Sequence, residues 1–141
     1  LYQSPAFHYS KPAIEGSLVN VYSLLDLCIS SNSIGTETEF TKELDPTLPD
    51  IRLQTESFIK LLNKVYSTHA ASKVVATKLY FRVGEYIRTE DKKYTLFSIE
   101  IKSEKVQKTR VSETRILAEE MNIFIDFKEK KTILNIPLIT D

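Results

Sequence analysis

A carboxylate and a lysine stand two residues apart in an apolar stretch, where residues 97–102 read FSIEIK. Side chains at this spacing point to the same face of a strand. Metal-dependent nucleases use such a pair, in which the Glu binds Mg²⁺ and the Lys stabilises the attacked phosphate. A second acid must then lie close to Glu100, but the candidate, Asp91, precedes it by about 30 Å of strand. A nuclease that uses Glu100 and Lys102 is therefore an alternative, and a solvated strand face is the favoured interpretation.

The other residue types that support catalysis are scarce, since the chain has three glycines, two histidines and one cysteine. Glycine-rich loops that hold phosphates follow the patterns GxGxxG or GxxxxGK[ST], and neither pattern occurs. No His or Cys pair has the spacing of a metal site, and no GxSxG marks a nucleophile. We therefore predict no catalytic residue, no cofactor and no metal. His69 is expected to be a packed or hydrogen-bonded residue, and Cys28 a small core residue.

Tyrosines and basic residues gather on the polar face of a predicted hairpin. Tyr and Arg are favoured at the centres of protein interfaces because they bury a large area and keep a polar group. Ordinary cross-strand pairing on an exposed sheet face is the simpler explanation, and single-stranded nucleic acid stacked on the tyrosines is a weaker alternative. The predicted partner-binding residues are Lys78, Tyr80, Arg82, Tyr86, Tyr94 and Lys102.

Two amphipathic segments are predicted to be helices. In residues 12–30 apolar side chains repeat at spacings of three and four, and Pro12 suits the first turn. This helix is apolar on more than one face, so we expect more than one of its faces to be buried. The chain's own arm and loop, or a second chain, would cover them. The second helix is expected over residues 50–69, with Asp50 as its cap.

From Lys73 onward the hydrophobic period changes to two, which predicts an antiparallel hairpin of residues 73–83 and 94–103. We set its register by placing apolar residues against apolar residues, which puts Phe81 opposite Ile99 and leaves residues 89–91 as the loop. Both helices are then expected on the face that consists of Leu79, Phe81, Val83, Phe97, Ile99 and Ile101.

The remaining segments carry weaker patterns. Residues 31–47 are expected to form a polar loop, with a short edge strand around residues 37–40 as the alternative. Residues 104–120 are expected to be a strand or bent connection that gives way to a short helical turn. Residues 122–141 are expected to form a second hairpin with Ile125 opposite Ile136. Its last strand is predicted to be an edge strand, because Pro137 cannot donate to a ladder.

These elements predict an α+β fold, with two helices packed on one face of a four- to five-stranded antiparallel sheet. A chain of 141 residues, 42% hydrophobic and 27% charged, fits a single domain over residues 1–141, with residues 1–12 as an extended arm. Because the chain starts at Leu1, we expect it to be a fragment of a longer one. The single cysteine and the lack of an 18-residue apolar run favour an intracellular domain without a membrane span.

The favoured functional interpretation is a non-catalytic module for protein–protein interaction or assembly, as a subunit of a larger complex. It rests on the missing catalytic groups, the apolar excess of the first helix and the Tyr/Arg face. The expected partner is another protein chain, in a homo- or heterodimer. The alternatives are the nuclease that uses Glu100 and Lys102, or a weak nucleic-acid-binding domain, although a net charge of zero argues against a strong field for nucleic acid.

Overall fold

A five-stranded mixed sheet lies at the centre of the computed structural model, which describes residues 16–89, 92–107 and 111–140. The strand order is β2 (Glu39–Leu44), β4 (Val74–Thr89), β5 (Lys92–Ser103), β7 (Lys131–Pro137) and β6 (Phe124–Phe127). β2 runs parallel to β4, and the other neighbours are antiparallel. The predicted arm, His8, the start of the predicted first helix and Asp91 lie outside the described residues.

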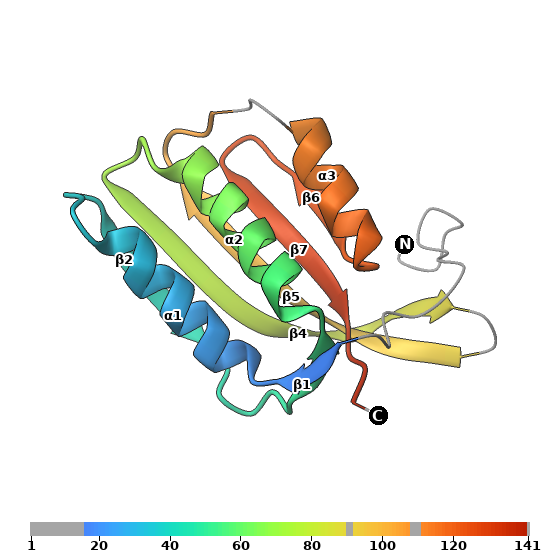
Figure 1. The fold of residues 1–141 in the computed structure, drawn as a ribbon. Helices are drawn as coiled ribbons and strands as arrows, with labels where there is room; N and C mark the ends of the chain where they lie inside the picture. The colour runs from blue at the N-terminus through green and yellow to red at the C-terminus, as the bar shows by residue number, and fades with distance from the viewer. Residues whose placement is uncertain (1–15, 90–91, 108–110, 141) are drawn as a thin grey trace.

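The helices of the described part all cover the same face of this sheet (Figure 1). They are α1 (Val21–Ser33), α2 (Thr55–His69) and α3 (Val111–Glu120). A two-stranded sheet of β1 (Ser17–Val19) and β3 (Ile51–Leu53) lies near the start of α1. None of these helices is long and apolar enough to cross a membrane. The predicted α+β class, with its helices on one face, is confirmed; the sheet is mixed because β2 joins it in parallel.

The core lies between the helices and the face of β4, β5 and β7 that they cover. Leu79, Phe97, Ile99 and Ile101 are at most 3% exposed, as the alternation predicts. α2 buries Phe58, Leu61, Leu62 and Val65 against them. Each such side chain contributes about 1.5 to 3 kcal/mol to the free energy of unfolding, because it is removed from water on folding. This layer is therefore the main apolar core of the described residues.

The hairpin of β4 and β5 has the predicted facing, but its register differs by two residues. Phe81 lies opposite Phe97, not Ile99. The register then breaks between Arg82 and Tyr86, where Gly84 has a φ of 81°. Residues 83–85 form a bulge, and Val83, which was predicted to face the helices, is 93% exposed. Because side chains alternate between the two faces of a strand, three extra residues turn every side chain beyond them to the opposite face of the sheet.

This reversal creates a second, small core near the far end of the hairpin. Ile87 and Leu96 are each 1% exposed, and Tyr94 and Phe124 pack against them. Leu96 lies on the sheet face opposite the helices, since it alternates with the helix-facing Phe97. We call this opposite side the open face. The bulge therefore lets a single long hairpin contribute apolar residues to both faces.

Three predicted segments differ from the structure in their boundaries. α1 begins only at Val21, because Asn20 caps it by accepting a hydrogen bond from the Ser23 amide at 2.9 Å. α2 begins at Thr55, since β3 occupies the residues that follow Asp50. The predicted loop over residues 31–47 contains β2.

The C-terminal part contains two further differences. Residues 111–120 form a regular helix, longer than the predicted turn. In the second hairpin Ile125 pairs with Leu134, two residues from the predicted Ile136, which keeps the facing. The prediction of an edge strand is wrong, because β7 lies between β5 and β6. Pro137 is tolerated there because it is the last residue of β7, beyond the end of β6.

Candidate functional site

A buried histidine connects the end of α2 with two strands of the sheet. His69 is 0% exposed, and its Nδ1 lies 2.6 Å from Ser103 Oγ at the end of β5. Its Nε2 lies 3.0 Å from Thr132 Oγ1 on β7. Ser103 Oγ donates its proton to the Lys105 carbonyl at 3.0 Å, so it accepts from the Nδ1–H of His69. Nε2 then accepts from Thr132, which assigns the neutral Nδ1–H tautomer.

Burial lowers the pKa of His69 to about 4, because the charged form of the ring loses its hydration in the protein interior. The ring is therefore neutral at pH 7. The prediction that His69 is a hydrogen-bonded residue is confirmed, and so is that of Cys28 as a core residue, at 2% exposure. We call His69, Ser103 and Thr132 the helix-face cluster.

The segment after β5, residues 104–107, is held against the end of α2, and we call it the strap. The Lys105 amide donates to Ser72 Oγ at 2.8 Å, and Ser72 Oγ donates to the Lys105 carbonyl at 3.0 Å. The Gln107 amide donates to the Thr68 carbonyl at 2.8 Å, which satisfies one of the last carbonyls of the helix. Because Ser103 also bonds Lys105, the helix-face cluster and the strap form one connected network.

A small hollow of about 10 Å³, room for about one water molecule, lies between the C-terminal half of α2, the strap and the start of α3. Its walls are mainly apolar, with a few hydroxyl groups and an amide. The lining residues are Thr68, Val106, Gln107, Val111, Thr114, Phe127 and Lys128. A mainly apolar hollow beside a polar network is the default position for a small-molecule site.

Two lysines lie near this hollow. Lys128 lines it, and Lys64 on α2 lies 3.9 Å from the Glu113 carboxylate on α3. Each lysine presents a mobile positive charge that suits an anionic group. One turn before His69, Tyr66 shares a 2.7 Å hydrogen bond with Thr77, and burial raises the pKa of its hydroxyl. The hydroxyl therefore remains protonated and supports the packing of α2 on β4.

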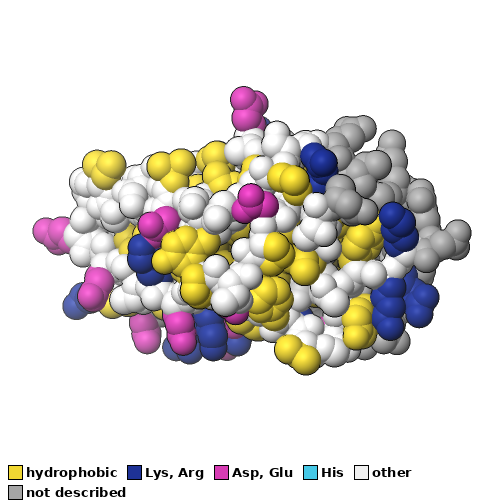
Figure 2. Space-filling view, turned by 90° about the horizontal axis from the view of Figure 1, so that it is seen from below, with side chains coloured by type: hydrophobic (Ala, Val, Ile, Leu, Met, Phe, Trp, Pro, Cys, Tyr) yellow, Lys and Arg dark blue, Asp and Glu magenta, His cyan; other side chains and the backbone are white. Residues whose placement is uncertain are grey.

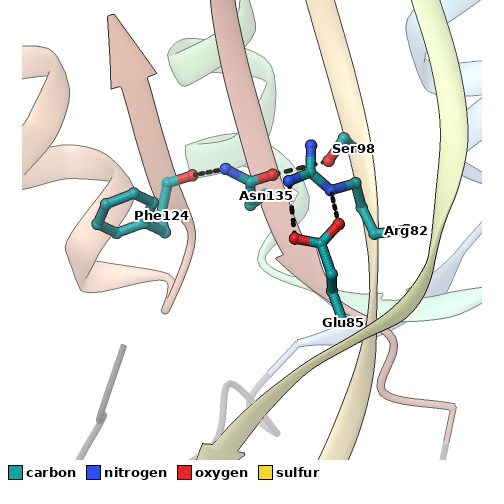
Figure 3. Close-up of polar contacts among 5 residues, drawn as sticks. All are labelled: Arg82, Glu85, Ser98, Phe124 and Asn135. Atoms are coloured by element: carbon teal, nitrogen blue, oxygen red, sulfur yellow. Dashed lines mark hydrogen bonds and ion pairs between the residues drawn. The ribbon is translucent and has the colours of Figure 1, made fainter. Parts of the chain in front are cut away.

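A second polar cluster lies on the open face (Figure 3). Ser98 Oγ donates to Asn135 Oδ1 at 2.7 Å, and Asn135 Nδ2 donates to the Phe124 carbonyl at 3.3 Å. Beside them, Arg82 donates to both carboxylate oxygens of Glu85, at 2.7 and 3.0 Å. Ser98 and Asn135 are both 0% exposed. We call these residues the open-face cluster; it links neighbouring strands and the bulge.

The structure divides the six predicted partner-binding residues between different environments. Lys78, Tyr80 and Lys102 lie on the open face, where the Lys78 ammonium is 5.5 Å from the centre of the Tyr80 ring. Arg82 is engaged with Glu85. The Lys93 ammonium lies 3.9 Å from the ring centre of Tyr86, whereas Tyr94 belongs to the small core of the open face. The bulge separates Tyr86 from Tyr94, so the six residues do not form one surface.

The carboxylate of the FSIEIK stretch lies beside lysine side chains in the described part of the chain. Glu100 pairs across the sheet with Lys78, and its carboxylate lies 3.5 Å from the Lys131 ammonium. Among the described residues no group of three or more His, Cys, Asp or Glu side chains is placed to hold a metal ion. The hydrogen-bonding and hollow-lining residues were missed by sequence reasoning, except His69, because Ser72, Ser103 and Thr132 carry no recognisable spacing.

Several solved structures share this architecture. The chain is similar to a histidine kinase of Acinetobacter baumannii, AdeS, with a TM-score of 0.61 and 9% identity over 88% of this chain and 68% of that one. It is similar to the histidine kinase domain of the E. coli osmosensor EnvZ, with a TM-score of 0.58 and 10% identity over 94% and 93%. It also matches the catalytic domain of the histidine kinase ThkA, with a TM-score of 0.57 and 11% identity over 89% and 97%.

No protein-family model matches the sequence, and no curated protein matches it either. The structural likeness overturns the interpretation as a non-catalytic assembly module, together with its nuclease and nucleic-acid alternatives, because the solved proteins that share this architecture are kinases. The prediction that the chain is not an enzyme is corrected on the same finding. The fold of this chain is that of the histidine kinase catalytic domains.

Proposed function

We propose that this chain is the ATP-binding domain of a histidine kinase, and that the nucleotide binds over the surface between α2 and α3. The likeness to kinase domains extends over about nine tenths of the chain, and one of these domains is described as a nucleotide-free catalytic domain. The observation that carries the proposal is this likeness of fold.

The size of the hollow limits where the nucleotide lies. Pockets for drug-sized ligands measure roughly 300 to 1,000 Å³, and this hollow measures about 10 Å³, room for about one water molecule. The proposal therefore places the flat, mainly apolar base over the surface between α2 and α3, and not inside the hollow. The ribose and phosphates then extend over the rim.

The phosphates are bound by side chains in this proposal. The three glycines are Gly16, Gly35 and Gly84, so the whole stretch from β5 to the C-terminus lacks a glycine that would let the backbone approach a phosphate. Lys64 and Lys128 supply positive charge at the hollow instead. For Lys64 this requires exchange of Glu113 for a phosphate oxygen, which costs little because the exposed pair at 3.9 Å is weak.

The phosphoryl acceptor lies elsewhere in this proposal. His69 is fully buried and both ring nitrogens are hydrogen-bonded, so it presents no free nitrogen to a γ-phosphate. In the proposed reaction an acceptor imidazole nitrogen forms the new bond to phosphorus, the bond to the β–γ bridging oxygen breaks, and ADP leaves. The acceptor belongs to another part of a longer kinase or to a partner chain, inside the cell where ATP is found.

The test measures ATP binding to the purified chain by calorimetry, with and without Mg²⁺. We expect saturable binding, with a Kd of about 1 mM or tighter, near −4 kcal/mol. Val111→Trp, which blocks the surface between α2 and α3, should abolish binding, and Ile116→Trp, at a residue of the same helix that is 57% exposed, should leave it unchanged. Absence of saturable ATP binding, or equal binding by the two variants, would reject the proposal.

We further propose a second copy of the chain as the protein partner, in contact with Lys78, Tyr80 and Lys102 on the open face. The helices leave this face uncovered (Figure 1), and Lys and Arg side chains lie beside Asp and Glu along the lower left margin in Figure 2. Sedimentation at several concentrations tests it: the mass should rise with concentration, and Tyr80→Ala with Lys102→Ala should keep the chain monomeric. A constant monomer mass in the unaltered chain would contradict it.

A further inference from the structure

A groove of about 420 Å³ lies on the open face, over the small side chain of Ala76 on β4. Charged side chains of β2, β4 and β5 surround it, and they include both signs of charge. On the open face these residues are Glu43, Lys78, Glu100 and Lys102. A surface of this kind is complementary to a second surface that carries the same charges in the reverse order.

These charges are only partly paired within one molecule. Lys78 and Glu100 are register partners on β4 and β5, but the Lys78 ammonium lies 5.5 Å from the centre of the Tyr80 ring. The Glu100 carboxylate lies 3.5 Å from the Lys131 ammonium. Across the described ranges, no carboxylate forms an ion pair with Lys78 or Lys102. Both ammonium groups are therefore available to a partner, on a face that the helices leave uncovered (Figure 1).

From these charges we infer that two copies of the chain pack open face to open face, about a two-fold axis that runs along the strands between β4 and β5. The inference rests on the second-copy partner proposed above and gives its arrangement. Lys78 of each copy then lies opposite Glu100 of the other, twice per dimer, because a two-fold interface repeats every contact. Lys102 of each copy enters the groove over Ala76 of the other, where Glu43 at the margin accepts its charge.

The position of the axis follows from the signs of the charges. An axis over β4 would set Lys78 against Lys78, and an axis over β5 would set Glu100 against Glu100. Like charges that meet at an interface are unfavourable. Between the two strands, the axis exchanges register partners of opposite charge. Packed sheets lie about 10 Å apart, a distance that a Lys and a Glu side chain span together from the two sides.

The experiment uses Lys78→Glu and Glu100→Lys, each alone and in an equimolar mixture, with the dissociation constant of self-association measured by sedimentation. Each variant alone places like charges opposite one another at both repeats of the contact, so we expect its dissociation constant to rise at least tenfold. In the mixture the introduced acid of one variant meets the introduced lysine of the other, and the native Lys78 meets the native Glu100. We therefore expect a heterodimer with the affinity of the unaltered chain.

Two controls accompany these variants. Lys60→Glu makes the same change of charge on an exposed residue of α2, on the opposite side of the sheet, and should leave the dissociation constant unchanged. Restored association in the mixture shows in addition that both variants are folded, since an unfolded variant would not complement the other.

The outcomes separate the arrangement from the proposed partner. If the unaltered chain dimerises and the mixture stays monomeric, the arrangement is overturned and the second-copy partner stands. Unchanged self-association of Lys78→Glu also overturns the arrangement. A loss in Glu100→Lys alone would then favour an axis across the strands, which pairs Glu100 with Lys102. If the unaltered chain is monomeric at every concentration, the partner and the arrangement both fail, whereas ATP binding is unaffected by that result.

Discussion

Two buried polar clusters lie on opposite faces of the same sheet, and they differ in what they connect. The helix-face cluster joins α2, β5 and β7 through His69, and it continues into the strap that walls the hollow. The open-face cluster joins neighbouring strands through Ser98 and Asn135, and neither side chain lines the hollow between α2, the strap and α3. The first network therefore continues into a surface segment, whereas the second holds strands together.

The largest expected difference between the clusters is their response to acid. The pKa of His69 is lowered from 6.5 to about 4 in the fold, so the unfolded chain binds a proton first as the pH falls. The folded state is therefore fully stable above pH 6.5 and loses stability between pH 6.5 and 4. The loss reaches about 3 kcal/mol, at 1.36 kcal/mol per pKa unit. Urea unfolding at half-unit pH steps measures it.

The control for this prediction is His69→Gln, which keeps a hydrogen-bonding side chain but does not titrate in this range. Its free energy of unfolding should be lower at pH 7 and nearly flat down to pH 5. A parallel pH dependence of the unaltered chain and His69→Gln would show that the helix-face cluster does not respond to acid.

A smaller effect is expected at the open face. Asn135→Ala removes the acceptor of Ser98 Oγ and leaves that hydroxyl buried, at 0% exposure. A buried unsatisfied group costs about 1 to 3 kcal/mol, so we expect a loss of about 2 kcal/mol that does not vary between pH 6.5 and 4.

Thermal unfolding of Asn135→Ala, Ser98→Ala and the double variant checks this. The double variant should lose less than the sum of the single losses, because the two side chains share one bond. Asn63→Ala breaks an exposed 3.0 Å bond to Asn32 and should cost well under 1 kcal/mol. Additive losses at Ser98 and Asn135 would mean that the open-face cluster is not a coupled network.

The sequence predicts those elements whose stability comes from a regular apolar pattern. The alternation around Phe81 and Ile99 and the stripe of α2 are strong because one side of each is fully buried. β2 was predicted only as an alternative to a loop, because four of its six residues are exposed, at the edge of the sheet. The register error arises because Phe81 satisfies the pattern equally well against Ile99 or Phe97.

The site was less predictable, for a physical reason. Ser72, Ser103 and Thr132 are ordinary hydroxyl residues until the fold brings them to His69 or the strap, so their roles depend on tertiary distances. The bulge had a weak signal, the isolated Gly84 within a strand pattern. The bulge also divides the predicted Tyr/Arg face, because the side chains exchange sides of the sheet between Arg82 and Tyr86.

The smallest effect is expected at the ion pair beside the bulge. Glu85→Gln keeps the size of the side chain but exchanges the two-oxygen acceptor of Arg82 for a neutral amide. The Glu85 side chain is 33% exposed, so solvent screens the pair and we expect a loss of about 1 kcal/mol or less. Urea unfolding in 0.05 and 1 M NaCl measures it, and the difference from the unaltered chain should shrink in high salt. A salt-independent loss above 2 kcal/mol would contradict this ranking, because the bulge would then depend on its ion pair as strongly as the strands depend on Asn135.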